Sequence, residues 1–395
     1  MKQRVPFYYN EFGCITSECK DNCCIGGWEI DIDDETYERY NNMTGELKSR
    51  IIDSITQNED EEYCFKLCDG KCPMLDDNGL CEIHKNLGED YLGVVCKQFP
   101  RYSEYYGTIK ESGIGLACEE AARIILSENR PFSMETAACD EEYEPSSEYD
   151  SSFALQIFAA REAVFKILAE ESLSIHEKLI VILDMGSKIQ QCINTDEYDN
   201  IKSVVNDYLK EGIAHTLDET RNLSDSGQFE DISLQQGIRQ ILYPYEEMEV
   251  LNPEWEVILK DIIDSLFEQM SDEEYNILNE EFGTYMVSRA YEYRQLLEYL
   301  VFRYFAKSIY DYDFLGKCQM LVTNFFVIRQ MDIIRWLDNH REYSFKDRMD
   351  VVHIFSRQVE YSEDNIENLY EDFIFDDIFK TDSLIAILWI DSENI

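Results

Sequence analysis

The sequence predicts a mainly α-helical protein in which a cysteine-rich, loop-dominated, metal-binding module is followed by an α-helical domain. Ten of the 13 cysteines lie before residue 119, and 11 of the 17 glycines lie at or before Gly115. No proline follows Pro253, so the rest of the chain lacks the strongest helix breaker. In the second half, apolar residues recur at spacings of three and four, the period of one helix face.

The cysteine-rich module is expected to span residues 1–139. It is expected to need a bound metal, because loops rich in cysteine and glycine bury little apolar surface of their own. Residues 140–152 are acidic and poor in apolar side chains, which is typical of a linker. The α-helical domain is expected to span residues 153–395.

Several helices of this domain can be placed from the sequence. Two helix faces are marked by apolar residues at helical spacing: Phe153, Ile157, Ala160, Val164 and Ile167, then Leu179, Ile182, Met185 and Ile189. Asn252 followed by Pro253 predicts a capped helix start, and residues 271–274 fit a capping box. The apolar window 321–334 carries polar residues, so it predicts a buried helix and not a membrane span.

The charge balance excludes some classes of partner. Against 81 Asp plus Glu there are only 35 Lys plus Arg, a formal net charge of −46. Nucleic acids and anionic membranes are not expected as partners, because both need clustered basic side chains. The acidity suits a cationic partner such as a substrate lysine, although it also serves solubility alone. The N-terminus has no apolar stretch typical of a secretory signal, so a cytoplasmic location is expected.

The early cysteines form two groups with short spacings. The first group is Cys14, Cys19, Cys23 and Cys24, and the second is Cys72, Cys81, Cys96 and Cys118. In a reducing compartment, such a dense set indicates metal or redox chemistry more than disulfides. Thiolates are soft ligands that suit zinc or an iron–sulfur cluster.

The residues alone leave the metal open. One structural zinc needs four ligands, so ten cysteines mean either two centres or several spectators. Neighbouring side chains diverge in extended backbone, so Cys23 and Cys24 are not expected to share one small ion. His84, three residues after Cys81, is an alternative zinc ligand, and disulfides or unligated thiols remain the third alternative.

Other features have an ordinary structural explanation beside a functional one. Cys139, Cys192 and Cys318 lie in apolar surroundings and are expected to be small core residues. Arg101 and Arg357 are expected in salt bridges, with a cofactor carboxylate as the alternative. Aromatic residues at helical spacing are expected in the core, with a channel for a substrate lysine as the alternative: Tyr291, Tyr293, Tyr299, Phe302, Tyr304 and Phe305.

At the cysteine groups and their flanks, the sequence resembles the flagellin lysine-N-methylase family, FliB, within the CxxCxxCC proteins that chelate zinc or iron. The resemblance covers the early cysteines and their neighbours: Cys14, Cys19, Cys23, Cys24, Gly27-Trp28, Gly70-Lys71-Cys72-Pro73-Met74-Leu75, Leu80-Cys81, Leu87-Gly88, Cys96, Phe99-Pro100-Arg101 and Leu116-Ala117-Cys118. It continues more weakly at 299–305 and 352–357. Cys64 and Cys68 lie outside this pattern.

The resemblance implies N-methylation of lysine side chains on flagellin, with S-adenosylmethionine as methyl donor and a [4Fe-4S] cluster held by the N-terminal cysteines. The implied ligands are drawn from one set: Cys14, Cys19, Cys23, Cys24, Cys72, Cys81, Cys96 and Cys118. Neither a radical-SAM cysteine motif nor a glycine-rich βαβ cofactor loop is present, so no catalytic residue or S-adenosylmethionine site can be named. The alternative function is a non-catalytic zinc- or iron-binding adaptor whose helical domain docks a protein partner.

Overall fold

The computed structural model describes the chain except for residues 20–22, 26–28, 59–60, 140–149, 226–231 and 394–395. Most of the predicted linker, 140–152, therefore lies outside the described residues. The described chain is mainly helical, and its N-terminal region is cysteine-rich with short helices and two small sheets. This confirms the predicted fold class.

The strands of the described chain all come before Cys139: β1 (Lys2–Pro6), β2 (Ile55–Gln57), β3 (Tyr63–Phe65), β4 (Arg101–Tyr106), β5 (Ile109–Ile114) and β6 (Met134–Ala138). The helices of the same region are short: α1 (Asp34–Asn42), α2 (Glu46–Asp53), α3 (Glu82–Leu87), α4 (Val94–Gln98) and α5 (Glu119–Leu126).

Longer helices build the rest of the chain: α6 (Ser151–Ala169), α7 (Ile175–Asn194), α8 (Ile201–Asp207), α9 (Ile213–Asp225), α10 (Leu234–Glu246), α11 (Pro253–Ile262), α12 (Asp272–Met286), α13 (Ala290–Tyr304), α14 (Ser308–Asp311), α15 (Phe314–Asp338), α16 (Phe345–Val359), α17 (Glu363–Phe375) and α18 (Thr381–Glu393). Central among them is α15, which is buried along most of its length and packs against α7, α13 and α16.

The predicted helix signals are confirmed. Both apolar faces lie on helices, α6 and α7, and the window 321–334 lies within the buried helix α15. The side chain of Asn252 caps α11, which begins at Pro253, and Ser271 and Glu274 form a complete capping box at α12. Local signals therefore place these helices correctly, because each one depends on neighbouring residues only.

The four-stranded sheet was not predicted. Its order is β4-β5-β1-β6, with β1 parallel to β5 and antiparallel to β6. Lys2 lies opposite Ile109 on one side and Ala138 on the other, so β1 pairs with strands that are distant in the sequence. Pairing at such distance leaves no local pattern, which is why the sequence predicted loops here.

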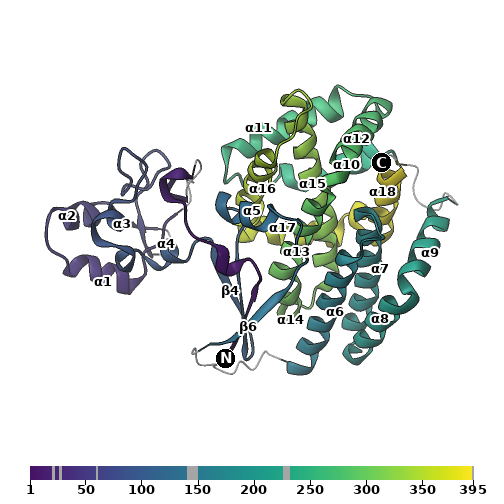
Figure 1. The fold of residues 1–395 in the computed structure, drawn as a ribbon, viewed down its shortest axis with the longest axis horizontal. Helices are drawn as coiled ribbons and strands as arrows, with labels where there is room; N and C mark the ends of the chain where they lie inside the picture. The colour runs from purple at the N-terminus through teal and green to yellow at the C-terminus, as the bar shows by residue number, and fades with distance from the viewer. Residues whose placement is uncertain (20–22, 26–28, 59–60, 140–149, 226–231, 394–395) are drawn as a thin grey trace.

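The buried apolar side chains of the described residues form two separate hydrophobic cores. The small core lies among α1–α4 and β3, and its buried members are Ile30, Ile32, Tyr40, Ile51, Phe65, Cys72, Met74 and Ile83. The large core runs from Tyr8 to Trp389 and joins residues of the four-stranded sheet and α5 to the helical domain. Figure 1 shows α1–α4 as a lobe beside the helical body, with the sheet and α5 between them.

This packing bears on the predicted boundaries, which stay a prediction. Tyr8, Tyr106 and Ile114 belong to the large core, although they come before residue 139. Within the described part of the chain, no helix combines the length and apolar character that crossing a bilayer requires.

Candidate metal centre

The eight candidate ligands lie on turns, loops and short helices of the N-terminal region. Cys14 and Cys19 flank a 3₁₀ turn (Thr16–Glu18), and Cys23 and Cys24 form another turn (Cys23–Ile25). Cys72 and Cys81 border a tight loop, and Cys96 lies on α4. Cys118 is the residue at the N-terminal cap of α5. Of these residues, Cys118 lies at the start of α5 and Cys19 contacts Glu119, the first residue of that helix.

Three thiols interact. Cys23, Cys24 and Cys72 lie close enough for their thiols to shift one another's pKa. These interactions raise the pKa of Cys24, lower that of Cys23 to about 7 and lower that of Cys72. The backbone supports the contact, because Cys72 N donates to Cys24 O at 2.8 Å. Two segments that are far apart in the sequence therefore meet at their sulfur atoms.

The expected divergence of Cys23 and Cys24 is wrong. It assumed extended backbone, whereas residues 23–25 form a 3₁₀ turn. In a helical turn, neighbouring side chains do not point to opposite faces as they do in a strand. The two thiols can therefore contact each other, as they do here.

Cys81 and Cys96 lie within electrostatic range of this group. Burial raises the pKa of the Cys81 thiol and raises that of Cys96 to about 12, and negative charge on Cys72 and Cys23 would raise both further. The loop between Cys72 and Cys81 is closed by Glu82 N donating to Met74 O at 2.8 Å. We call Cys23, Cys24, Cys72, Cys81 and Cys96 the thiol group.

The remaining candidates lie beside the N-terminus of α5. The Cys19 thiol donates to Glu119 Oε2 at 3.5 Å. Burial raises the pKa of Cys118 to about 11, and Cys23 and Cys14 contribute in the same direction. Since α5 packs against α13 and α16, Cys118 connects the thiol group to the helical body.

The donor chemistry of the thiol group fits a thiolate-bound metal. Thiolates that converge from separate loops are the ligand type of zinc and iron–sulfur sites. Among the described residues, no three Cys, His, Asp or Glu side chains stand in an arrangement that would already hold a metal ion. The ligand assignment therefore remains a prediction.

Other predicted candidates lie at different places. Cys64 is buried on β3, where burial and Glu29 raise its pKa, and Cys68 is exposed in a turn. His84 is exposed on α3. Cys192 and Cys318 are buried core residues as predicted, whereas Cys139 is only half-buried beyond β6.

The two arginines singled out in the sequence make different contacts. The Arg101 guanidinium lies 4.9 Å from the ring centroid of Phe12. Arg357 is buried on α16, where Nη1 lies 3.4 Å from Nε2 of His353. Positive charge on Arg357 lowers the pKa of Cys23, so α16 faces the thiol group with a cation.

The aromatic run in α13 belongs to the core, as expected. Tyr293, Tyr299, Phe302, Tyr304 and Phe305 are all buried, while Tyr291 is half-buried. Phe302 is within 6.1 Å of Phe132 between ring centroids, which ties α13 to the segment before β6. These aromatic side chains therefore contribute packing, while the same helix also buries the polar side chains of Glu292, Gln295 and Glu298.

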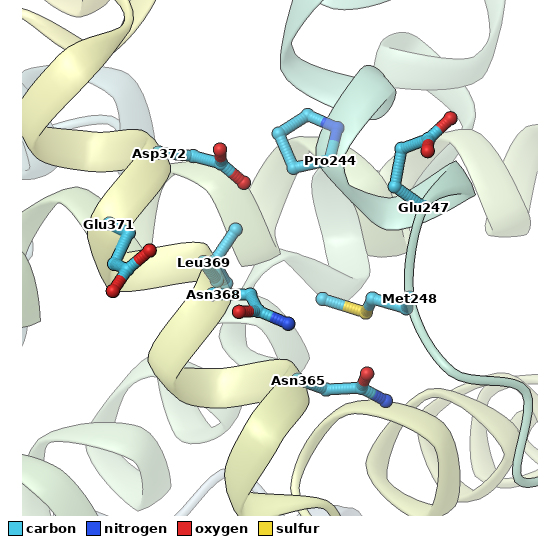
Figure 2. Close-up of a pocket in the computed structure, with 8 residues that line it drawn as sticks. All are labelled: Pro244, Glu247, Met248, Asn365, Asn368, Leu369, Glu371 and Asp372. Carbon is cyan, nitrogen blue, oxygen red and sulfur yellow. The ribbon is translucent and has the colours of Figure 1, made fainter.

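A pocket of about 220 Å³ lies between α10 and α17. Figure 2 shows its lining residues: Pro244, Glu247, Met248, Asn365, Asn368, Leu369, Glu371 and Asp372. Burial, with Asp376 and Glu371, raises the pKa of Asp372. The amide group of Asn365 is already engaged, because Oδ1 accepts from Glu249 N at 2.9 Å and Nδ2 donates to Glu249 O at 3.0 Å.

Fold and site together define a mainly helical protein whose N-terminal region is rich in cysteine and contains two small sheets. The family model described as "FliB lysine N-methylase C-terminal domain" matches residues 161–387, which is more than half of the chain. The chain belongs to the FliB lysine N-methylase family.

Individual relatives match over a shorter stretch. The chain is 31% identical over 129 residues to the lysine-N-methylases of Salmonella typhimurium and Salmonella choleraesuis. This stretch covers 31% of the chain and 32% of each of those two proteins, so it spans about a third of their length. The flagellar biosynthetic protein FliU of Salmonella muenchen is 32% identical over 129 residues, 76% of its own length. No solved structure matches the chain.

Proposed function

We propose that the protein transfers methyl groups from S-adenosylmethionine to lysine side chains of flagellin, and that it does so in the cytoplasm. Family membership supports the lysine N-methylase activity, because the family model covers most of the helical domain. The relative named for flagellar biosynthesis supports flagellin as the substrate. The net charge of −46 also favours a substrate that presents lysine.

Our proposal includes a [4Fe-4S] cluster held by the early cysteines. The contacts within the thiol group carry this part, because they join Cys24 to both Cys23 and Cys72. Ligands would come from the thiol group, with Cys14, Cys19 and Cys118 as the neighbouring candidates. Such a cluster would supply either an open iron for the amino and carboxylate groups of the donor or a structural centre that holds the fold together while transfer happens nearby.

Methyl transfer to lysine requires that the protein first accept a proton from the lysine ammonium. A lysine ammonium has no lone pair, so it must first lose a proton to a carboxylate or another base. The amine nitrogen then attacks the methyl carbon, and the N–C bond forms as the C–S bond breaks. The electron pair of that bond stays on sulfur, which leaves a neutral thioether. An apolar, buried site assists because it lowers the pKa of the lysine.

Metal analysis tests the cluster. Wild type, Cys72→Ser and Cys68→Ser are purified anaerobically, and iron, acid-labile sulfide and zinc are measured together with the visible absorption. We expect Cys72→Ser to lose most of its iron and sulfide, because Cys72 lies in the thiol group. Cys68→Ser is the matched control, since Cys68 is exposed in a turn outside that group.

The mass of flagellin from cells with and without the protein tests the activity. We expect methylated flagellin only where the wild-type protein is present. Equal flagellin masses in both strains would contradict the methylase proposal. Colourless protein with stoichiometric zinc and no response to S-adenosylmethionine would support the adaptor instead.

A further inference from the structure

A buried carboxylate lies where α16 ends, close to the candidate metal centre. Glu360 caps the C-terminus of α16, and its side chain is 0% exposed. Tyr299 and Tyr304 donate their hydroxyl groups to its Oε2, each at 2.9 Å. Arg303 Nε lies 3.1 Å from the same oxygen. One carboxylate oxygen is therefore held by three donors from α13.

The second oxygen of the Glu360 carboxylate, Oε1, has a different environment from Oε2. Glu360 Oε1 is buried and has no hydrogen-bond partner among the described residues. Leaving a buried charged acceptor without a donor costs about 1–3 kcal/mol or more. Buried polar atoms of this kind call for a ligand, a water or an ion. Since Oε2 is already saturated, Oε1 is the acceptor that remains for such a ligand.

Two buried tyrosine hydroxyl groups near Arg303 also lack a hydrogen-bond partner among the described residues. They belong to Tyr8 and Tyr102. The Arg303 guanidinium lies 4.6 Å from the ring centroid of Tyr102 and 5.7 Å from that of Tyr361. Tyr8 is within electrostatic range of both Tyr102 and Arg303. Polar groups from the N-terminal segment, β4, α13 and the end of α16 thus converge.

Two glycines permit this convergence. A Cβ atom on Gly115 would lie 2.8 Å from Tyr361 Oη and 3.1 Å from Arg303 Nη1. One on Gly113 would lie 2.4 Å from Tyr102 Oη, which is closer than real Cβ atoms come to other atoms. Glycine at 113 and 115 therefore lets the backbone before Cys118 approach the arginine and the tyrosines.

The centre adjoins both the surface and the thiols. Tyr361 is 37% exposed, so a surface side chain lies directly beside Arg303. Cys118 is three residues after Gly115 and lies within electrostatic range of Tyr361. Leu116 N also donates to Tyr299 Oη at 3.3 Å. The segment that leads to Cys118 therefore contacts one of the tyrosines that hold Glu360.

We propose that Glu360 Oε1 binds a primary ammonium group, with Tyr299, Tyr304 and Arg303 as positioning residues that hold the carboxylate. A primary ammonium is the complementary ligand, because it offers charged donors to an unmatched carboxylate oxygen. It has two sources within the proposed function, on which this inference rests: the substrate lysine and the amino-acid end of the sulfonium donor.

The test measures binding by the full chain, purified anaerobically, with calorimetry. One pair of probes is S-adenosylhomocysteine and methylthioadenosine, which lacks the amino-acid end. The second pair is flagellin and flagellin whose lysines have been acetylated. We expect Glu360→Gln to weaken the binding of one ammonium-bearing probe by about tenfold or more, the loss typical of one charge-assisted hydrogen bond. The matching probe without the ammonium, methylthioadenosine or acetylated flagellin, should bind with equal affinity to the variant and the wild type.

Two control variants separate binding from folding. Glu292→Gln changes another buried glutamate, whose two oxygens are both held by Arg289, and it should leave all four affinities unchanged. Tyr304→Phe removes one bond to Oε2 and keeps Oε1, so it should weaken binding far less than Glu360→Gln does. Melting curves verify that each variant is folded, and Glu360→Asp replaces Glu360→Gln if that variant is not.

The outcomes are distinct. Weaker binding of S-adenosylhomocysteine assigns the ammonium to the donor, and weaker binding of unmodified flagellin assigns it to the substrate lysine. Unchanged affinities in Glu360→Gln overturn the inference and leave only a buried water at Oε1. If the affinities are unchanged but the wild type methylates flagellin, the proposed function is retained and only the role of Glu360 is rejected. If the wild type binds none of the probes, both fall.

Discussion

Glu298 on α13 has a carboxyl group that is 3% exposed and bonded to Arg294 Nη1 at 2.6 Å and 2.8 Å. Burial raises its pKa to about 7, and Arg294 and Lys178 only partly oppose that effect. The unfolded chain releases the same proton near 4.5. Because the folded state holds this proton to a higher pH, Glu298 lowers the stability as the pH rises from about 4.5 through 7.

This shift predicts a pH-dependent effect of Glu298→Gln. Glutamine resembles the protonated acid, so the variant should gain stability relative to the wild type by about 3 kcal/mol between pH 5 and pH 8. Urea unfolding at both pH values measures the difference. Glu273→Gln, on an exposed site of α12, controls for the substitution. A constant difference between Glu298→Gln and wild type would contradict the raised pKa.

At the level of elements, a buried ion cluster joins four helices. Asp391 of α18 accepts from Asn279 of α12, and its Oδ2 lies 2.7 Å from His176 Nε2 of α7. Arg329 of α15 donates from Nη2 to Asn279 Oδ1 at 3.0 Å, and the same Nη2 lies 4.0 Å from Asp391 Oδ1. Burial alone would raise the pKa of Asp391, but Arg329 and His176 hold it at about 2. The carboxylate therefore stays charged in the core.

Removal of this charge should detach α18. Asp391→Asn leaves Arg329 buried without its countercharge, and we expect the free energy of unfolding to fall by about 3–5 kcal/mol. Thermal and chemical unfolding measure the loss. Asp382→Asn changes an exposed residue of the same helix and should cost much less. Equal stability of the two variants would show that the ion cluster is not a stabilising contact.

At the level of the whole molecule, the two cores differ greatly in size. The small core has eight buried apolar residues, one of which, Cys72, belongs to the thiol group. A core of this size gives little stability without a metal or another cross-link. The large core extends through β4, β5, α5 and the helical domain, so it does not depend on the thiols.

Loss of metal should therefore unfold one lobe only. We expect metal-free protein to exchange backbone amide hydrogens rapidly over residues 30–98, while residues of α7, α13 and α15 keep their protection. Hydrogen exchange of the loaded and stripped protein, followed by mass spectrometry, gives the comparison. Restored protection after reloading is the control for damage by chelation. Uniform loss across all helices would mean that the two cores fold as one.

The sequence predicted different parts of this molecule to different extents. Helices α11 and α12 were placed by their capping residues, because capping depends on neighbours. Spacing also predicted that the early cysteines gather at a metal; this stays a prediction, which the interactions among Cys23, Cys24 and Cys72 support. The family resemblance was strongest between Cys14 and Cys118, whereas the family model matches 161–387. Both lead to the same family.

The Glu360 centre could not have been predicted. Its members lie at positions 8, 102, 299–304 and 360, and only the tertiary packing brings them together. Gly113 and Gly115 are the one hint that the sequence carries, but a short Gly-x-Gly is also typical of a turn. The structure shows a second reason for these glycines, which is the close approach of Tyr102 and Arg303.

The position of β1 has a consequence for synthesis on the ribosome. This strand lies between β5 and β6, so both of its edges need partners that are translated later. The residues of β1 must therefore wait until β6, which ends at Ala138, has emerged before all their hydrogen bonds can form. Until then the nascent chain carries a strand with two unpaired edges, which are open to pairing with other chains.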